Sequence, residues 1–148
     1  MESKYDSLKL ENQLCFPIYL CSKEIIRRYT PFLDKLDLTY TQYIVMMYFW
    51  EKEKSNVKDI SKTLLIDSGT LTPLLKKLEK KGYIKRVRST IDERNLEVTI
   101  TEKGMNLREE ALSVPKNMKE CIQLEEKDAK TLYKIMYQLL YNIEKEEK

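Results

Sequence analysis

A cysteine near the start of the chain is the residue type best suited to chemistry in this sequence. Cys15 lies in the segment Leu10 to Tyr19, "LENQLCFPIY", among apolar side chains. A free cysteine usually packs in a protein core like a small hydrophobe, whereas a reactive cysteine needs surroundings that favour the thiolate, which is the nucleophile. The local sequence therefore leaves two interpretations open: Cys15 fills the core, or it senses an oxidant.

Other kinds of reactive site are excluded by composition. The chain of 148 residues contains no histidine, which removes Ser-His and Cys-His catalysis, the HExxH zinc motif and most zinc or copper sites. We therefore expect no cofactor, no metal site and no catalytic residue, and we predict that the protein is not an enzyme. A thiol peroxidase is the enzymatic alternative, but the sequence has neither alternating strands and helices nor a CxxC pair.

The sequence also predicts the cellular compartment, and with it the state of the cysteines. No apolar run approaches the roughly 18 residues that a membrane span requires, and the polar N-terminus does not resemble a signal peptide. We therefore predict a cytoplasmic protein that makes no use of a membrane. In that compartment Cys15, Cys21 and Cys121 are expected as thiols rather than as structural disulfides.

The elements that must position these residues are mostly helices, since the chain has only three glycines and four prolines. Helical spacing of apolar residues predicts a helix within residues 8–38, which Pro17 kinks unless the helix begins close before it, with a second bend at Pro31. Another helix is expected over residues 39–50, capped by Thr39. Further helices are predicted from 104 to 113 and from 127 to 144, with Cys121 in the linker between them.

The middle of the chain has the pattern of a winged helix-turn-helix. Ser55 or Asn56 can cap a short helix, and Asp67 can cap a second one that ends at Gly82. Two β-type segments, "YIKRVRS" and "LEVTITE", follow around "TIDERN" and predict a hairpin. We therefore predict a mainly α protein with a small β-hairpin wing, in one domain over residues 1–148 with the winged lobe at about 39–112.

A basic block coincides with the second helix and the wing. Seven cations and one acid, Glu79, lie between residues 76 and 88. Such a patch suits duplex phosphates, and the hydroxyls of Ser68, Thr70 and Thr72 suit phosphates or base edges. A solvated charged helix face is the alternative. The cations of the block are Lys76, Lys77, Lys80, Lys81, Lys85, Arg86 and Arg88.

Several motifs resemble a known family of regulators. "DSGTLTPLLKKLEKKGYIKR", "DERN" and "TEKG" resemble the recognition helix and wing of MarR-family transcriptional regulators. "LENQLCF" together with "LTYTQY" resembles the branch of organic hydroperoxide resistance and SarZ-like regulators within that family. The resemblance covers about residues 8 to 110 and places Cys15 and the DNA-binding segment in register with the family.

The resemblance implies a homodimeric repressor that binds double-stranded operator DNA. Terminal helices, at about residues 8–38 and 114–148, would interlock in the dimer, and the second helix of the lobe would enter a major groove. Arg94 has the place of the family's wing-tip arginine in the minor groove, and Asp92 would hold the wing in shape. The expected DNA-binding residues are Ser68, Thr70, Thr72, Lys76, Lys77, Lys85, Arg86, Arg88, Asp92 and Arg94.

For Cys15 the resemblance implies a peroxide-reactive thiolate. Family members hydrogen-bond this sulfur to tyrosines of the partner subunit at the positions of Tyr29 and Tyr40, with a further tyrosine at Tyr19. Two general effects favour a thiolate here, namely the partial positive charge at the start of a helix and hydrogen bonds donated by tyrosine hydroxyls. An organic hydroperoxide would then oxidise Cys15 and release the operator.

The other two cysteines have different expected roles. Cys21 follows Cys15 by six residues, which is about 9 Å along a helix, so a disulfide between them is disfavoured and Cys21 is predicted to be core. A branch of the family with two cysteines uses a C-terminal resolving cysteine of the partner, and Cys121 has that place. The alternative end product is a mixed disulfide of Cys15 with a low-molecular-weight thiol.

Two other functions remain open at this point. Many relatives release DNA on binding a phenolic or aromatic ligand without covalent chemistry, and Cys15 would then be passive. A winged helix can also bind protein, and Tyr133, Tyr137 and Tyr141 form a stripe at helical spacing that would line such a contact or a dimer interface.

Overall fold

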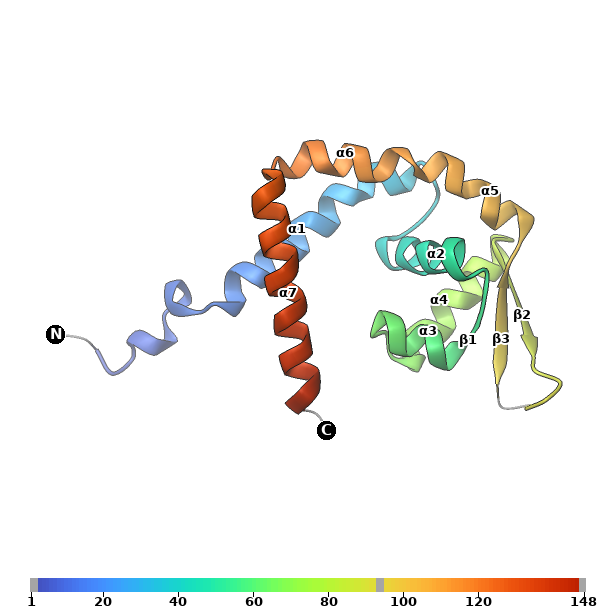
Figure 1. The fold of residues 1–148 in the computed structure, drawn as a ribbon, viewed down its shortest axis with the longest axis horizontal. Helices are drawn as coiled ribbons and strands as arrows, with labels where there is room; N and C mark the ends of the chain where they lie inside the picture. Colours follow the sequence, from blue (N-terminus) through green and yellow to red (C-terminus); the bar gives the residue numbers. More distant parts are fainter. Residues whose placement is uncertain (1–2, 93–94, 147–148) are drawn as a thin grey trace.

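The structure is a computed structural model that describes residues 3–92 and 95–146. It consists of a compact winged lobe and of long helices that extend away from that lobe (Figure 1). The elements are two 3-10 turns, η1 (Asp6–Leu8) and η2 (Leu10–Asn12), followed by α1 (Cys15–Asp34), α2 (Tyr40–Lys52), β1 (Lys54–Asn56), α3 (Val57–Leu64), α4 (Ser68–Lys80), β2 (Ile84–Arg88), β3 (Leu96–Ile100), α5 (Glu102–Ala111), α6 (Ser113–Ile122) and α7 (Glu126–Glu146).

The predicted wing is present and has one strand more than expected. β2 and β3 form the antiparallel hairpin, with Ile84 opposite Ile100 and Arg88 opposite Leu96. The short strand β1 pairs antiparallel with β3, which gives the order β1-β3-β2. β1 carries no alternating pattern of apolar and polar residues, because three residues are too few to alternate. The fold prediction of a mainly α chain with a β wing is confirmed.

The four helices of the lobe begin at side-chain caps. Each cap accepts a hydrogen bond from the backbone N–H three residues later, which satisfies a donor that the helix itself leaves free. At α2 the cap is a full capping box, because Gln42 Oε1 also accepts the Thr39 N–H at 3.1 Å. The caps of α2, α3, α4 and α5 are Thr39, Asn56, Asp67 and Thr101.

The hydrophobic core lies inside the winged lobe and extends along the α1–α6 junction. Phe49, Leu75 and Val98 are fully buried and join α2, α4 and the sheet. Trp50 links α2 to α5, because its Nε1–H donates to the Gly104 carbonyl at 2.9 Å. Gly104 must be glycine, since a Cβ there would lie 2.2 Å from the Tyr83 carbonyl oxygen.

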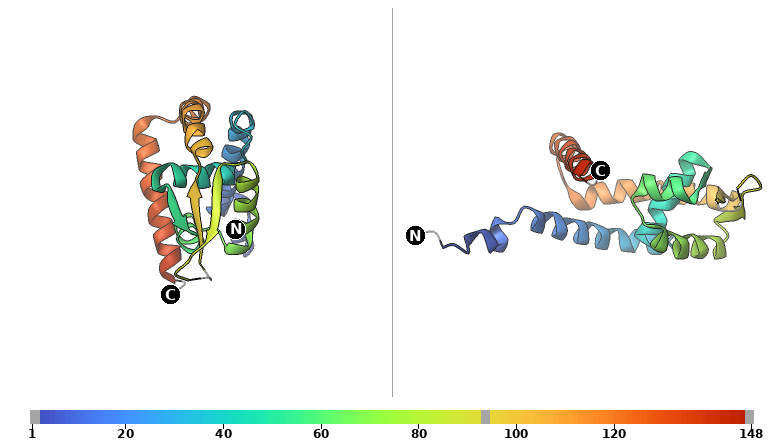
Figure 2. Two further views of the ribbon diagram at one scale, coloured as in Figure 1. Left: turned by 90° about the vertical axis from the view of Figure 1, so that its right-hand side faces the viewer. Right: turned by 90° about the horizontal axis from the view of Figure 1, so that it is seen from below.

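The terminal helices are far less buried. α1 packs along α6, but Leu33 is its sole buried residue, and none of the described residues of α7 is buried. Figure 1 shows the N-terminal segment extending beyond the lobe and α7 running down from the end of α6, and the right-hand view of Figure 2 shows the same N-terminal extension from below. None of the described helices is both long enough and apolar enough to cross a membrane.

One expectation for these helices needs correction, and the structure decides the open question about Pro17. The segment after α5 was predicted to be a linker, but it forms α6, with Pro115 in its first turn, where proline has no N–H to lose from the hydrogen-bond ladder. Pro17 also lies in the first turn of its helix, because α1 begins at Cys15. The helix thus starts close before Pro17, and α1 continues through Pro31 to Asp34.

Candidate DNA interface and thiol site

The second helix of the motif, α4, is held in place from both ends. Asp67 Oδ1 accepts the Thr70 N–H at 2.9 Å, and Asp67 Oδ2 accepts the Thr70 hydroxyl at 2.8 Å. The Thr70 side chain is thus used within the helix start, and these bonds hold the pKa of Asp67 below its ordinary value. At the other end Gly82 takes a φ of +80°, which glycine adopts without strain.

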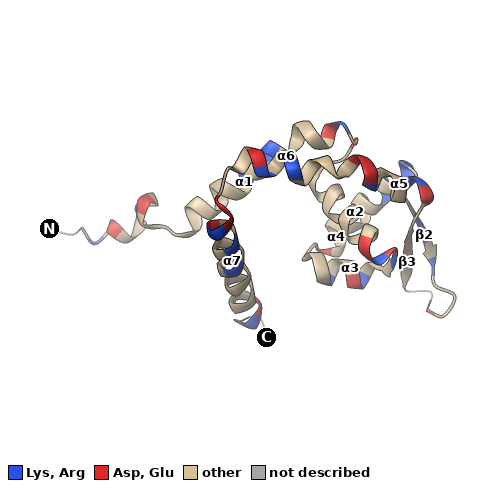
Figure 3. Ribbon diagram, turned by 45° about the horizontal axis from the view of Figure 1, so that its top comes forward, with Lys and Arg blue, Asp and Glu red and all other residues tan. Residues whose placement is uncertain are grey.

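The basic block divides into free and engaged cations. Lys76, Lys77, Lys85 and Arg88 are exposed, and among the described residues none of them forms an ion pair. Lys81 is turned inward, where its Nζ donates to the Asp37 carbonyl and to Gln42 Oε1 at the α1–α2 junction. Figure 3 shows the cations of β2 in blue beside the hairpin.

Arg86 differs from the DNA-contacting role expected for it. Its Nη2 lies 2.7 Å from Glu79 Oε2, its Nε donates to the same oxygen at 3.0 Å, and its backbone N–H donates to Oε1 at 2.9 Å. Only 18% of the Arg86 side chain is exposed. Arg86 therefore fastens the wing to α4 and is not a free cation for phosphates. The sequence signal was present, since Glu79 is the one acid in the block.

The base of the wing loop is fixed by backbone hydrogen bonds. Asn95 donates its N–H to the Asp92 carbonyl at 2.9 Å, and Ser89 donates its N–H to the Asn95 carbonyl at 2.8 Å. Asp92 thus takes part in the hydrogen bonds at the base of the wing loop, and the wing-shaping role expected for it stays a prediction. Arg94, the predicted minor-groove residue, lies outside the described residues.

Cys15 is exposed and is the first residue of α1. The N-cap residue of α1 is Leu14, which provides no side-chain hydrogen bond. Phe16 donates its N–H to the Gln13 carbonyl at 3.3 Å and Pro17 has no N–H, so the helix start favours a neighbouring anion mainly through the helix dipole. Tyr19 follows one turn later on the same face and is also exposed. The role expected for Tyr19 beside Cys15 stays a prediction.

Tyr29 and Tyr40 form a separate aromatic cluster with Tyr43, which sequence reasoning missed. The Tyr29 ring centroid lies 4.8 Å from that of Tyr40 and 5.9 Å from that of Tyr43. Burial raises the pKa of all three phenols, so their hydroxyls stay protonated at neutral pH. Tyr43 was predictable in principle, because it lies three residues after Tyr40 on the same helix.

The tyrosine cluster cannot reach Cys15 of its own chain. Tyr29 follows Cys15 by fourteen residues on the continuous helix α1, which is about 21 Å along the axis. A hydrogen bond between the two sites therefore requires a second copy of the chain.

The other two cysteines are also exposed. Cys21 was predicted to be core, and that prediction is wrong for the single chain because its side chain is exposed on α1. Cys121 lies in the last turn of α6 rather than in a linker. Beside it an apolar groove of about 550 Å³ runs between α1, α6 and α7, lined by Ile25, Ile122, Leu132, Met136 and Leu140 among others.

Comparisons with known proteins place this architecture. Residues 27–111 match the family described as "Transcriptional regulator SarA/Rot". The organic hydroperoxide resistance transcriptional regulator of Bacillus subtilis is 44% identical over 140 residues, which cover 95% of each chain. The HTH-type transcriptional regulator SarZ of Staphylococcus saprophyticus is 50% identical over 118 residues, which cover 80% of each chain.

Solved structures give the same result. AbfR of Staphylococcus epidermidis aligns with a TM-score of 0.77 at 32% identity, covering 96% of this chain and 98% of that one. The structure described as reduced AbfR bound to DNA aligns with a TM-score of 0.77 at 33% identity, covering 95% of this chain and 99% of that one. The structure described as disulfide-formed AbfR aligns with a TM-score of 0.64 at 32% identity, covering 93% of this chain and 96% of that one.

The fold and the exposed basic helix define a winged-helix transcriptional regulator. The chain belongs to the MarR/SarA-type family of DNA-binding transcriptional regulators. Its relatives are transcriptional regulators and not enzymes, which confirms the prediction that this protein is not an enzyme.

Proposed function

We propose that this protein is a homodimeric repressor that binds operator DNA through α4 and the wing, and that leaves the operator when an organic hydroperoxide oxidises Cys15. One observation carries the proposal. An exposed thiol lies at the uncapped start of α1, while the protonated tyrosines that could hold its thiolate lie about 21 Å away on the same chain. A dimer that brings Tyr29 and Tyr40 of one subunit to Cys15 of the other supplies the missing half of the site.

The chemistry needs only one reactant from outside. The Cys15 thiolate attacks the terminal oxygen of the hydroperoxide, the O–O bond breaks, and the leaving alkoxide takes a proton to become an alcohol. Cys15 is then a sulfenic acid. The added oxygen places bulk and polarity among the tyrosine hydroxyls, which favours a rearrangement of the two winged lobes away from successive grooves.

The second step depends on which thiol reaches the sulfenic acid. In the proposed route the Cys121 thiol of the partner attacks the Cys15 sulfur, a disulfide forms and water leaves. The exposure of both thiols and the existence of a disulfide-formed state of AbfR support this route. A low-molecular-weight thiol that attacks in the same way yields a mixed disulfide instead.

An operator gel shift tests the proposal. Wild-type protein treated with cumene hydroperoxide should release the duplex, and Cys15→Ser should stay bound at the same peroxide concentration. Cys21→Ser is the matched control, because it removes an exposed thiol from the same helix and should respond like wild type. If Cys15→Ser also dissociates, oxidation of Cys15 is not the signal.

Non-reducing electrophoresis separates the two end products. A peroxide-dependent covalent dimer that disappears in Cys121→Ser supports the intersubunit disulfide. A monomeric band whose mass increases by that of an added small thiol supports the mixed disulfide.

A second candidate function rests on the apolar groove between α1, α6 and α7. Release by a phenolic or aromatic ligand would use such a hollow and would leave Cys15 passive. Salicylate added to the complex of Cys15→Ser with its operator distinguishes this mechanism, since dissociation without the thiol favours it.

A further inference from the structure

A polar notch lies between α3, the start of α4 and the base of the wing. It measures about 390 Å³ and is lined by Val57, Lys58, Ser61, Ser68, Thr72, Asn95 and Leu96. Among the residues that the structure describes, Lys58 is the one charged group in that lining, and none of them contributes a carboxylate. Hydroxyl and amide groups beside a lone cation are the donors that an anion requires.

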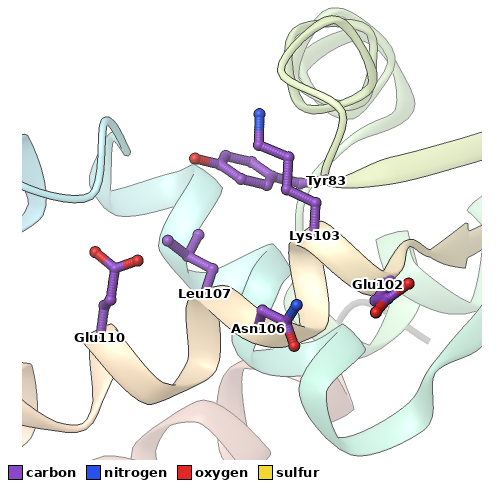
Figure 4. Close-up of a pocket in the computed structure, with 6 residues that line it drawn as sticks. All are labelled: Tyr83, Glu102, Lys103, Asn106, Leu107 and Glu110. Atoms are coloured by element: carbon purple, nitrogen blue, oxygen red, sulfur yellow. The ribbon is translucent and has the colours of Figure 1, made fainter.

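Volume alone does not select this notch. A hollow of similar size, about 440 Å³, lies at the base of the wing against α5 (Figure 4). There Glu102 and Glu110 accompany Lys103, whose Nζ lies 5.2 Å from the Tyr83 ring centroid. Two carboxylates oppose an anion, so the charge of the lining and not its size distinguishes the two hollows.

The groups around the notch leave defined donors free. Ser61 is a wall and not a donor, because its hydroxyl donates to the Ile66 carbonyl at 2.6 Å. Asp67 turns its carboxylate onto Thr70, and the Asp59 carboxylate accepts from Asn56 Nδ2 at 2.8 Å. The donors that remain toward the notch are the Lys58 ammonium and the Ser68 and Thr72 hydroxyls. Asn95 Nδ2 donates one hydrogen to Asp92 Oδ2 at 3.4 Å, and its second hydrogen is the donor left for the notch.

The position of the notch indicates which anion it takes. Ser68 and Thr72 are four residues apart and share one face of α4, and exposed Lys76 continues the same row. The opposite wall is Asn95, at the base of the wing. A duplex that receives α4 in its major groove must pass its sugar–phosphate backbone between that helix and the wing.

We propose that this notch holds one backbone phosphate of the operator, bound by Lys58, Ser68, Thr72 and Asn95. This inference rests on the proposed DNA binding and divides the recognition helix by task. The row Ser68–Thr72 contacts the sugar–phosphate backbone and positions the helix, and it carries no sequence information. Lys58 and Asn95 enter the interface from outside the basic block.

Titrations of operator and of unrelated duplex at several salt concentrations test the assignment. Lys58→Gln should weaken binding to both duplexes by the same factor, roughly 5- to 20-fold. A dimer has two notches, so the slope of log affinity against log salt should fall by about 2. Thr72→Val keeps the side-chain shape and should weaken both duplexes equally, by roughly 3-fold.

Lys62→Gln is the matched control, because Lys62 is an exposed lysine on the same helix that does not line the notch. Its salt slope should stay at the wild-type value. An equal loss in Lys58→Gln and Lys62→Gln, or a loss in Thr72→Val for the operator alone, overturns the proposal.

Two further outcomes have defined meanings. If wild-type protein binds the operator and Lys58→Gln binds it unchanged, the notch assignment fails and the proposed function stands; if wild-type protein binds no duplex, the proposed function fails. Tight binding of inorganic phosphate alone that Lys58→Gln abolishes, with duplex binding unchanged, assigns the notch to a free anion and overturns the proposal.

Discussion

The winged lobe and the terminal helices of this chain differ in how far their helix ends are capped and their apolar faces are buried. In the lobe every helix from α2 to α5 begins at a side-chain cap, and its apolar faces meet in one core. α1 and α6 begin without a side-chain cap, and α7 exposes large apolar residues, among them Leu132, Ile135 and Leu140. In Figure 3 the middle of α7 carries no charge.

This difference indicates that the terminal helices, and not the lobe, need a second copy of the chain. A lobe with satisfied caps and a closed core can hold its shape on its own chain. A helix of 21 residues with an uncovered apolar stripe has a large hydrophobic free energy to gain from a second copy. The proposed sensor Cys15 lies in these terminal helices, so its proposed oxidation would act where the apolar surface calls for a second copy of the chain.

The largest expected effect on DNA binding comes from placing charges in the apolar stripe of α7. The double substitution Leu132→Glu and Leu140→Glu should give a monomer with a folded lobe, because the charges would be buried at the dimer contact. Operator affinity should fall by about 10²- to 10⁴-fold, since the two lobes no longer bind as a linked pair. Light scattering and a gel shift measure both changes.

Lys134→Glu is the control for this pair, since it changes the charge of the opposite face of α7. It should leave the dimer intact. A dimeric double variant with wild-type affinity would refute the inference that the terminal helices, and not the lobe, need a second copy of the chain.

A core truncation in the lobe should cost global stability instead. Phe49 is fully buried, so Phe49→Ala should lower the free energy of unfolding by about 3–5 kcal/mol, through lost burial and a residual cavity. Urea denaturation followed by circular dichroism gives the value. Met47→Ala, on the partly exposed side of the same helix, should cost far less; equal losses would show that the core does not distinguish the two faces of α2.

The ion pair that fastens the wing should make stability depend on pH. Hydrogen bonds from Arg86 hold the pKa of the Glu79 carboxyl below its ordinary value of 4.5. A lowered pKa means that the contribution is present at neutral pH and is lost as pH falls below that value. Glu79→Gln should cost about 1–2 kcal/mol at neutral pH, discounted because a third of Glu79 is exposed.

Urea unfolding of wild type and Glu79→Gln at neutral pH and at about pH 3 measures this dependence. The two proteins should converge in stability at the acidic end. A difference that stays constant with pH would mean that Glu79 acts through packing and not through charge.

The smallest expected effect is the loss of one cap. Asn56 Oδ1 accepts the Asp59 N–H at 2.8 Å at the start of α3, and Asn56→Ala should reduce the free energy of unfolding by about 1 kcal/mol. Asn56→Asp keeps an acceptor and should retain most of that stability. Equal losses in both variants would place the effect in the side-chain amide, which also bonds to Asp59, and not in the cap.

Local signals in the sequence were sufficient for the lobe. Thr39, Asp67 and Gly82 mark helix ends through chemistry confined to a few neighbouring residues, and the structure places them as caps and a turn. The sequence prediction is wrong at α6, where Pro115 suggests the end of a helix. Proline is tolerated in a first helical turn, and α6 begins two residues before it.

The candidate sites divide in the same way. The cations of α4 and β2 are identified from their number alone. Glu79, the one acid of the block, indicates that a cation is paired, but the sequence does not show that its partner is Arg86, nor that Lys81 bonds to Asp37 and Gln42. Those pairings join residues from different elements, and only the folded chain brings them together. Lys58 and Asn95 were missed for the same reason, since each lies outside the basic block.

By itself the sequence determined the helices of the lobe, the wing, the basic face and the cysteine at the start of α1, because caps, turns and periodicity act over a few residues. Only the tertiary structure decided which cations stay free, that a notch forms between α3, α4 and the wing, and that Cys15 lies about 21 Å from Tyr29 of its own chain. Each of these features depends on how parts of the chain that are far apart in sequence lie in space, and long-range packing determines that.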